Sequence, residues 1–523
     1  MTQLMASDKW KQLPWKKFQR IVFRLQRRIW KAQKTNNYRL VRQLQKLLLR
    51  SQAAKFLAVR QVTQLNKGKK TAGVDGVKSL SPQQRLNLVS ELDVNQWQHQ
   101  PLRRVWIPKS KGERRGLGIP TIADRAHQSL LKIALEPACE AYFSAASYGF
   151  RPGRSTLDIQ KKLFHNLRSQ SHGITKSILE MDISKCFDQI NHRFLMSQIS
   201  LPPQAKQALW KALKAGVETE FPKSKQGTPQ GGCISPLLAN IALHGLADLG
   251  TGYRYADDCV FILKPADNPE KLRHKIDEFL AIRGLKVKEA KTKLVASTEG
   301  FDFLGWHFRV KGNGKFISTP SDKNYSRIQE NIKTTLKNSF FKLEARINKV
   351  CLMVRGWRNY HKHCDMNNHN LWFIRYWSWK FIRRQGRFNR RETDIQIDRA
   401  FPSVSWSVNK FVNVIGTKSP FDGNLTYWSQ RKSKQYNGHT IRALQRQGYK
   451  CGECSLAFLP EDKVELHHID GNHHNWKTKN LVACSFASRM SSRSEGSFLL
   501  KTAKGKILSL ARSVVRLTSH ATF

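Results

Sequence analysis

The chain has 523 residues, 40% of them hydrophobic, which is enough for several domains with a buried core. Lys and Arg number 91 against 38 Asp and Glu, and the resulting net charge of +53 favours a polyanionic partner, nucleic acid before an acidic membrane. No uninterrupted apolar run is long enough for a membrane-spanning helix. The nine Cys residues are scattered and odd in number, and no signal-peptide pattern opens the chain, so we expect a reducing compartment.

Residues 9–60 are rich in Lys, Arg and Gln and carry apolar residues at helical spacing. The opposite face of these helices is cationic. A solvated helix face and an organellar transit peptide are the alternatives, but the charge density and length favour an RNA-facing helical region. We therefore predict that four arginines of this region contact RNA: Arg20, Arg24, Arg27 and Arg28.

The elements that follow mix strands and helices, which indicates an α/β or α+β class. Residues 67–76 predict a loop, 101–120 a strand, a basic turn and a second strand, and 130–143 a helix broken near Pro137. Further along we expect a buried strand at 177–184, a Gly-rich loop leading into a helix at 226–243, a hairpin at 252–263, a helix at 269–282 and one strand at 300–308. Residues 320–395 predict helices, and 396–438 a linker or small module.

Two adjacent carboxylates, Asp257 and Asp258, lie at the tip of the predicted hairpin. They repel each other, so a positive group is expected beside them. A polar turn is the simpler interpretation of this pair alone. Asp182 ends an apolar strand, however, and an unpaired buried carboxylate is costly. Carboxylates from two strands suit phosphoryl transfer with two Mg²⁺ ions roughly 3.5–4 Å apart.

Eight blocks in order resemble one family, the group II intron-encoded proteins, which combine a reverse transcriptase and a maturase. The blocks are KTAGVDG, RRVWIPKSKGERRGLGIPTIADR, LEPACEAYFSAASYGFRPGRST, MDISKCFD, QGTPQGG, YADD, GFDFLGW and RGWRNYH. The resemblance implies a multidomain α+β chain with a right-hand polymerase and a helical thumb (domain X). It divides the chain into fingers with an N-terminal extension (1–175), palm (176–315), thumb (316–395), a DNA-binding or linker region (396–438) and an HNH-like ββα domain (439–523).

The resemblance also assigns roles in the polymerase site. Asp182 and Asp257 would bind Mg²⁺, with Asp258 as the third carboxylate. Phe187 would be a steric gate that excludes a 2′-hydroxyl, although core packing is the alternative. Lys291 would protonate pyrophosphate, with Lys288 or Lys293 as alternatives. The residues that would bind the nucleotide and template are Lys109, Arg115, Gln230, Gly231 and Gly232.

In the thumb, aromatic residues alternate with arginines, a pattern that suits unpaired RNA bases and phosphates. The segments are RGWRNYH (355–361) and LWFIRYWSWKFIRR (371–384), and a helical core with a basic outer face is the alternative. The predicted RNA-binding residues are Arg355, Trp357, Arg358 and Tyr360.

The C-terminal region resembles an HNH endonuclease, but its last part departs from the family pattern. His467 would bind metal, His468 would activate water and Asn480 would fix the loop, while Cys451 and Cys454 would begin a Zn²⁺ site. After Asn480 the only Cys is Cys484 and no His occurs before His520; His473 and His474 lie in the wrong segment to substitute. The tail resembles an out-of-frame replacement, so we predict an impaired nuclease.

The predicted function is RNA-directed DNA synthesis together with assistance to intron splicing. The resemblance implies as partners a group II intron RNA in a lariat ribonucleoprotein, target DNA and dNTPs, with no membrane. A bacterial cytoplasm or nucleoid is the expected location, before an organelle. Retron, diversity-generating and defence-type reverse transcriptases, which lack a maturase role, are the alternative.

Overall fold

The structure is a computed structural model that describes residues 2–66, 68–108, 114–217, 221–223, 226–228, 231–407, 411–433, 436–459 and 462–485. Two predicted site residues, Lys109 and Gln230, lie outside these ranges, as does the tail after Ser485. Within them, no helix has the length and apolar character needed to cross a bilayer.

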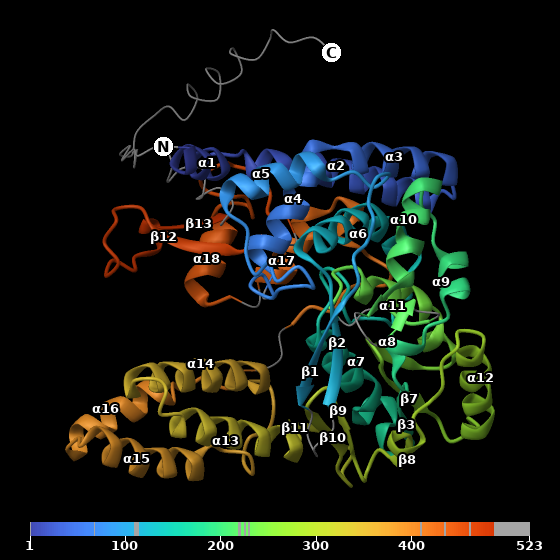
Figure 1. The fold of residues 1–523 in the computed structure, drawn as a ribbon. Coiled ribbons are helices and arrows are strands. Elements are labelled where there is room, and N and C mark those ends of the chain that lie inside the picture. The colour runs from blue at the N-terminus through green and yellow to red at the C-terminus, as the bar shows by residue number, and fades with distance from the viewer. Residues whose placement is uncertain are drawn as a thin grey trace.

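Basic helices cover one side of the molecule, along the top of Figure 1. They are α1 (Thr2–Lys11), α2 (Trp15–Lys34), α3 (Tyr38–Arg50), α4 (Gln52–Arg60) and α5 (Pro82–Glu91), so residues 9–60 are helical as predicted. The apolar faces of α2, α3 and α4 pack on α6 (Ile122–Tyr142). Val22, Ile29 and Leu48 thereby share a core with Leu130 and Leu131, which leaves the cationic faces turned outward.

Helix α6 corrects the prediction of a break near Pro137, because it runs unbroken through that residue. A proline removes the backbone bond to the carbonyl four residues earlier, here that of Ile133. The side-chain amide of Gln26 on α2 donates to the Ile133 carbonyl over 3.1 Å, so the oxygen keeps a partner. Burial of both neighbouring turns holds the helix together.

A four-stranded antiparallel sheet forms the centre of the molecule. Its order is β6 (Gly252–Tyr255), β7 (Asp258–Leu263), β3 (Ser177–Asp182) and β8 (Lys293–Ala296). Side chains alternate between its faces: Leu179 and Phe261 join the core beneath α6, whereas Ile178 and Val260 join a second core. The covering and neighbouring elements are α7 (Thr156–Leu167), α8 (Cys186–Gln189), α9 (His192–Gln198), α10 (Pro203–Lys214), α11 (Ser235–Ala242) and α12 (Pro269–Ala281).

Two hairpins flank this sheet. β1 (Arg103–Pro108) and β2 (Arg114–Ile119) form the long hairpin predicted for residues 101–120, and β4 (Ala215–Val217) pairs with β5 (Phe221–Lys223).

The predicted single strand at 300–308 is wrong. The segment folds back on itself as β9 (Phe301–Phe303) and β10 (Trp306–Val310), and β10 also pairs with β11 (Phe316–Pro320). Leu304 and Gly305 at the turn have φ values of +53° and +84°. A two-residue hairpin turn with both residues at positive φ matches the twist of the flanking strands, and Gly305 supplies that conformation without strain.

Four helices form a separate unit at the lower left of Figure 1: α13 (Asp322–Lys337), α14 (Leu343–His361), α15 (Trp372–Gly386) and α16 (Arg390–Ala400). Their apolar stripes meet in one core that contains Ile332, Val350, Val354, Ile382 and Ile397. The helical prediction for 320–395 is confirmed.

The range 396–438, which is predicted to be a linker, a small module or a DNA-binding region, contains a segment that packs on the rest of the molecule. Residues 411–433, which include the 3₁₀ turn η7 (Pro420–Asp422) and α17 (Leu425–Ser433), pack against the body of the molecule. Phe411, Val414, Phe421 and Trp428 are at most 5% exposed. These residues follow no helical or strand period, so their spacing does not indicate a buried segment. The chain then forms α18 (Gly438–Arg446) and the hairpin β12 (Val464–His468) and β13 (Leu481–Ser485).

Candidate active site

Three carboxylates meet at one end of the central sheet. The register pairs Asp182, the last residue of β3, with Asp258, the first residue of β7. Directly opposed side chains in an antiparallel pair have Cβ atoms about 4.5–5.5 Å apart. Asp257 precedes Asp258 in the turn after β6, where Ala256 has a φ of +61°. The fold therefore brings together Asp182, Asp257 and Asp258, which lie up to 76 positions apart in the printed sequence.

The positive group expected beside this cluster is Lys291, in the 3₁₀ turn η6 (Glu289–Lys291). Its Nζ lies 2.5 Å from Oδ2 of Asp182, and its charge interacts with Asp258 and Asp257 as well. The hydrogen bond to Asp182 is the main reason that the pKa of Lys291 is raised, so the ammonium stays charged at neutral pH.

The turn that carries Lys291 is tied to the same strand, because the backbone N–H of Lys288 donates to the Asp182 carbonyl over 2.8 Å. Of the three lysines considered for this position, Lys291 is the one whose side chain forms a described hydrogen bond with Asp182.

Asp258 differs from an ordinary surface aspartate in its proton affinity. Loss of hydration raises its pKa to about 6, and the negative charges of Asp257 and Asp182 act in the same direction, while Lys291 lowers it. The cluster therefore holds more negative charge than one lysine neutralises, which favours a further cation.

The donor set fits Mg²⁺. Within the described part of the chain, no set of three or more His, Cys, Asp or Glu side chains is arranged to hold a metal ion. Mg²⁺ usually binds one or two carboxylates and completes its shell with water and substrate phosphates, so it needs no such preformed set. Asp182 and Asp257 supply carboxylate oxygens, which Mg²⁺ prefers as ligands. The contact of the Lys291 ammonium with Asp182 shows that a positive charge is stable beside this carboxylate.

Phe187 lies near these carboxylates on α8 and is 7% exposed. Its ring packs edge-on to Phe150 at 6.4 Å between centroids, and its carbonyl accepts from the Thr228 N–H over 2.6 Å. The neighbouring Cys186 thiol interacts with both Asp257 and Asp182, which places the start of α8 beside the site. Phe187 thus takes part in the core and also borders the carboxylate cluster.

The residues predicted to bind the nucleotide are only partly described. The backbone of Arg115 pairs with Ile107 across the β1–β2 hairpin, while its side chain lies outside the described part. Gly231 approaches β2 closely, because a Cβ at this position would lie 2.5 Å from the Gly118 carbonyl oxygen. The glycine therefore allows close contact with the hairpin.

The arginines of α2 present cations to solvent, since Arg20, Arg24 and Arg28 are exposed. Arg27 is also exposed, but it lies against the turn at Gly423, where a Cβ would lie 2.4 Å from its Nε. The structure thus separates three open arginines from one that contacts the 411–433 segment.

Trp357, Arg358 and Tyr360, which are predicted to bind RNA, all contact other parts of the protein. Trp357 is 9% exposed and donates to the Asn324 side chain over 2.7 Å. Tyr360 stacks on Trp306 at 4.4 Å and donates to the Leu304 carbonyl over 2.8 Å. Arg358 donates to the carbonyls of Phe401 and Pro402. Of this predicted group, Arg355 is the exposed one.

Aromatic side chains open to solvent lie instead on α15. Trp372 and Tyr376 are stacked on each other at 5.7 Å, and with Phe373 they are 49–72% exposed. Sequence reasoning named the segment but not these residues. Their spacing of one and four residues, which places them on one helical face, is the signal that could have selected them.

In the C-terminal region, Asn480 fastens the loop between β12 and β13. Its side chain donates to Asp470 over 2.8 Å and to the Asn475 carbonyl over 2.9 Å, and accepts from the Asp470 N–H. His467 and His468 lie next to each other on β12, so their side chains point to opposite faces of the hairpin. Nδ1 of His468 is 3.0 Å from the Asn475 carbonyl oxygen.

Three cysteines of this region meet at one point, because the thiols of Cys454 and Cys484 both hydrogen-bond to the Cys451 sulfur and lower its pKa. The predicted Zn²⁺ site at Cys451 and Cys454 finds no support, since no group of three or more His, Cys, Asp or Glu among the described residues is arranged to hold a metal ion.

The chain matches three domains of known proteins. Residues 10–92 match the N-terminal domain of reverse transcriptase, residues 107–308 match reverse transcriptase (RNA-dependent DNA polymerase), and residues 325–399 match the maturase-specific domain of group II introns.

Among curated proteins, the chain is 31% identical to Maturase-like protein 1 of Euglena gracilis over 429 residues, which covers 80% of this chain and 92% of that protein. It is 37% identical to Group II intron-encoded protein LtrA of Lactococcus lactis subsp. cremoris over 189 residues, which covers 35% of this chain and 31% of that protein. Apo telomerase from Candida tropicalis shares a TM-score of 0.37 at 13% identity, with 65% of each chain covered.

The site and the sequence matches define a polymerase of the reverse transcriptase class, with mixed helix and sheet. The chain belongs to the family of group II intron-encoded and maturase-like proteins, and combines a reverse transcriptase with a maturase domain. The match to the maturase-specific domain argues against the alternative of a reverse transcriptase without a maturase role.

Proposed function

We propose that this protein copies a group II intron RNA into DNA at an insertion site and assists the splicing of the same intron. The observation that carries the proposal is the meeting of Asp182, Asp257 and Asp258 beside Lys291 at the end of the central sheet. The family commonly employs Mg²⁺, and Asp182 and Asp257 would hold two such ions, which supply charge stabilisation for nucleotidyl transfer when bound.

The chain's own residues have separate roles in the proposed reaction. Lys291 keeps a proton beside the carboxylates and is suited to protonate pyrophosphate. Phe187 borders the cluster and would exclude a 2′-hydroxyl, so that dNTPs are preferred. Lys109 and Arg115 would bind the triphosphate. Gln230, Gly231 and Gly232 would line the nucleotide and template pocket.

The proposed maturase activity depends on cationic and aromatic surfaces. Arg20, Arg24, Arg28 and Arg355 offer exposed charges for RNA phosphates. The exposed rings of α15 are suited to stack on unpaired bases. We divide the chain as proposed from the sequence, into fingers (1–175), palm (176–315) and thumb (316–395), with residues 411–433 moved from the linker to the body.

We further propose retrohoming by target-primed reverse transcription, in a lariat ribonucleoprotein that also binds target DNA in the nucleoid of a bacterium. The HNH-like region would contribute little nicking, because after Asn480 the sequence has a single Cys, Cys484, and no His before His520. A nascent strand at a replication fork would then provide the primer.

The function is tested by replacing Asp257 and Asp258 with Ala. We expect primer extension on intron RNA to disappear while protein-assisted splicing persists, because the carboxylates serve only nucleotidyl transfer. Loss of both activities in a variant that still binds the intron would contradict separate roles. Sequencing the RNA that co-purifies with the protein identifies the intron.

The nuclease proposal has its own assay. Incubation with target DNA and Mg²⁺ or Mn²⁺ should leave the bottom strand intact, and efficient bottom-strand nicking would refute impairment. For the primer source, insertion should fall when host replication is blocked; unchanged insertion would count against a fork-derived primer.

A further inference from the structure

A buried ion pair connects the C-terminal part of the chain to the body. Asp158, at the start of α7, is fully buried, and its carboxylate lies 2.5 Å from Nη2 of Arg431 on α17. The same carboxylate accepts from the N–H groups of Ser155 (2.9 Å) and Val414 (3.0 Å). Arg431 completes its contacts with the carbonyls of Val412 and Gly153 and with the ring of Phe411. A satisfied pair of this kind costs stability when one partner is removed.

The 144–154 loop lies between this pair and the turn that carries Asp257. On one side, Gly153 has a φ of +73°, and a Cβ there would lie 2.6 Å from Cζ3 of Trp428. On the other side, a Cβ at Gly149 would lie 2.3 Å from the backbone nitrogen of Ala256. The loop is therefore in close contact with the 411–433 segment at one end and with the residue before Asp257 at the other.

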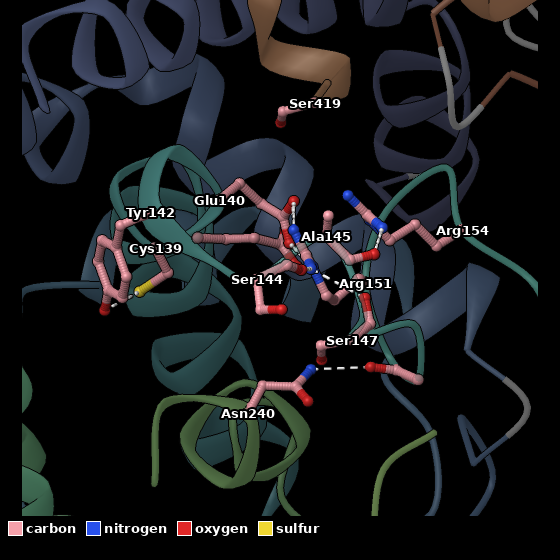
Figure 2. Close-up of polar contacts among 12 residues, drawn as sticks. Cys139, Glu140, Tyr142, Ser144, Ala145, Ser147, Arg151, Arg154, Asn240 and Ser419 are labelled. Atoms are coloured by element: carbon pink, nitrogen blue, oxygen red, sulfur yellow. Dashed lines mark hydrogen bonds and ion pairs between the residues drawn. The ribbon is translucent and has the colours of Figure 1, made fainter. Parts of the chain in front are cut away.

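Figure 2 shows hydrogen bonds that join this loop to neighbouring residues and to itself. Arg151 donates to both oxygens of the Glu140 carboxylate over 2.8 and 2.9 Å and to the carbonyls of Ser144 and Ser147. Arg154 donates to the Ala145 carbonyl and Asn240 donates to the Gly149 carbonyl, each over 2.8 Å. Buried hydrogen-bond networks rigidify the segments that they join, so we expect the two ends of the loop to move together.

The loop is also bonded directly to the strand before the turn. The Tyr148 N–H donates to the Arg254 carbonyl, and the Arg254 N–H donates to the Ala146 carbonyl. The buried Arg254 guanidinium joins the Ser147 hydroxyl (2.6 Å) to the Ala256 carbonyl (2.8 Å). The position of Asp257 thus depends on the position of the 144–154 loop.

We propose that Arg431 and Trp428 are positioning residues for the polymerase site, which act by holding the 144–154 loop against the Ala256–Asp257 turn. This inference rests on the proposed polymerase function. The matched family domains end at residue 399, so it gives a role in catalysis to a segment beyond them. Among the described elements, η7 packs chiefly on α2 and α17 on α18, rather than on the β1–β2 hairpin, so triphosphate binding should not depend on this segment.

The test is steady-state primer extension on an RNA template with the full-length chain. Arg431→Gln keeps hydrogen-bonding capacity but removes the charge and the planar fork. We expect kcat to fall on the order of 10- to 100-fold, as for a misplaced catalytic group, with KM for dNTP unchanged. Arg431→Lys should restore part of the rate. Lys418→Ala, which alters the same segment at a residue paired with Asp422, is the matched control and should behave as wild type.

Melting temperature and intron RNA affinity separate positioning from general damage. Unchanged kcat in Arg431→Gln, or a parallel loss of kcat, RNA affinity and melting temperature in both Arg431→Lys and Trp428→Phe, would overturn the proposal. If Arg431→Gln does not fold, Trp428→Phe decides, because it reduces the contact with Gly153 without burying a lone charge. Absence of primer extension by the wild-type protein would count against the polymerase function, and not against the positioning role.

Discussion

Among Lys288, Lys291 and Lys293, Lys291 is the lysine whose ammonium contacts the carboxylate cluster. Its ammonium contacts the Asp182 carboxylate, whereas Lys293, the first residue of β8, lies opposite Glu180 of β3. We expect Lys291→Ala to lower the rate of nucleotide addition on the order of 10²- to 10⁴-fold, the usual contribution of general acid–base catalysis. Lys293→Ala is the control and should keep the wild-type rate. Single-turnover extension measures both, and equal rates in the two variants would exclude the assigned role.

The raised pKa of Asp258 predicts that the free energy of unfolding depends on pH. Its pKa is raised to about 6 from an ordinary 3.8, so the folded protein holds this proton more tightly than the unfolded chain does. Its ionisation therefore destabilises the fold as pH rises from about 4 to about 6, and the cost is complete above that range. In EDTA, Asp258→Asn should raise the melting temperature relative to wild type at pH 7, and the difference should vanish below about pH 4. A constant difference across the range would contradict the assignment.

At the scale of an element, the β9–β10 turn shows how a short motif fixes a connection. Gly305 has a φ of +84°, and a Cβ there would lie 2.8 Å from Nδ2 of Asn324 on α13. Gly305→Ala should destabilise the fold by about 1–2 kcal/mol, the cost of a left-handed conformation for a residue with a side chain. Gly312→Ala is the control, because its Cβ would meet open space. Thermal melting compares the two, and equal melting temperatures would show that the turn rearranges freely.

Helices α14 and α15 differ in what their tryptophans do. Trp357→Ala should destabilise the four-helix unit by about 3–5 kcal/mol, as for other buried large aromatic residues. Trp372 is 60% exposed, so Trp372→Ala should change stability by less than about 0.5 kcal/mol. It should weaken intron RNA binding by about 1–3 kcal/mol if the ring stacks on a base. Melting curves and filter binding measure the two quantities; wild-type RNA affinity in Trp372→Ala would remove α15 from the RNA surface.

At the scale of the whole molecule, the charge of +53 sets how binding responds to salt. A protein that contacts six to ten phosphates displaces their counterions when it binds. Its affinity therefore falls about 10³- to 10⁵-fold when the salt concentration rises from 50 to 200 mM. We expect intron RNA affinity to fall in this manner. The logarithm of RNA affinity should fall linearly with the logarithm of salt concentration. Exchange of Arg20, Arg24 and Arg28 for Gln should make the slope of that line shallower by about one for each phosphate that is no longer neutralised. A slope that is unchanged in the triple variant would show that α2 faces away from RNA.

How far the sequence predicts the molecule differs between its parts. The carboxylates could be predicted, because a polar pair at a hairpin tip and an acid at the end of an apolar strand are local patterns. The break at Pro137 was predicted wrongly, because the partner that satisfies the Ile133 carbonyl, Gln26, lies on another helix. The sequence also did not predict that Trp357 and Tyr360 contact Asn324 and Leu304, since a Trp–Arg–Tyr pattern is the same on a buried and on an exposed helical face.

The sequence by itself determined the family, the order of most helices and strands and the identity of the three carboxylates, because these depend on residue type and on spacing within short segments. Only the tertiary structure decided which lysine reaches Asp182, which aromatic rings remain exposed, and that residues 411–433 pack on the 144–154 loop. Those features depend on contacts such as Asp158 with Arg431, 273 positions apart. Such contacts form when the hydrophobic faces of distant segments pack together. The hydrophobic periodicity of one segment shows which of its faces is buried but not which other segment packs against it.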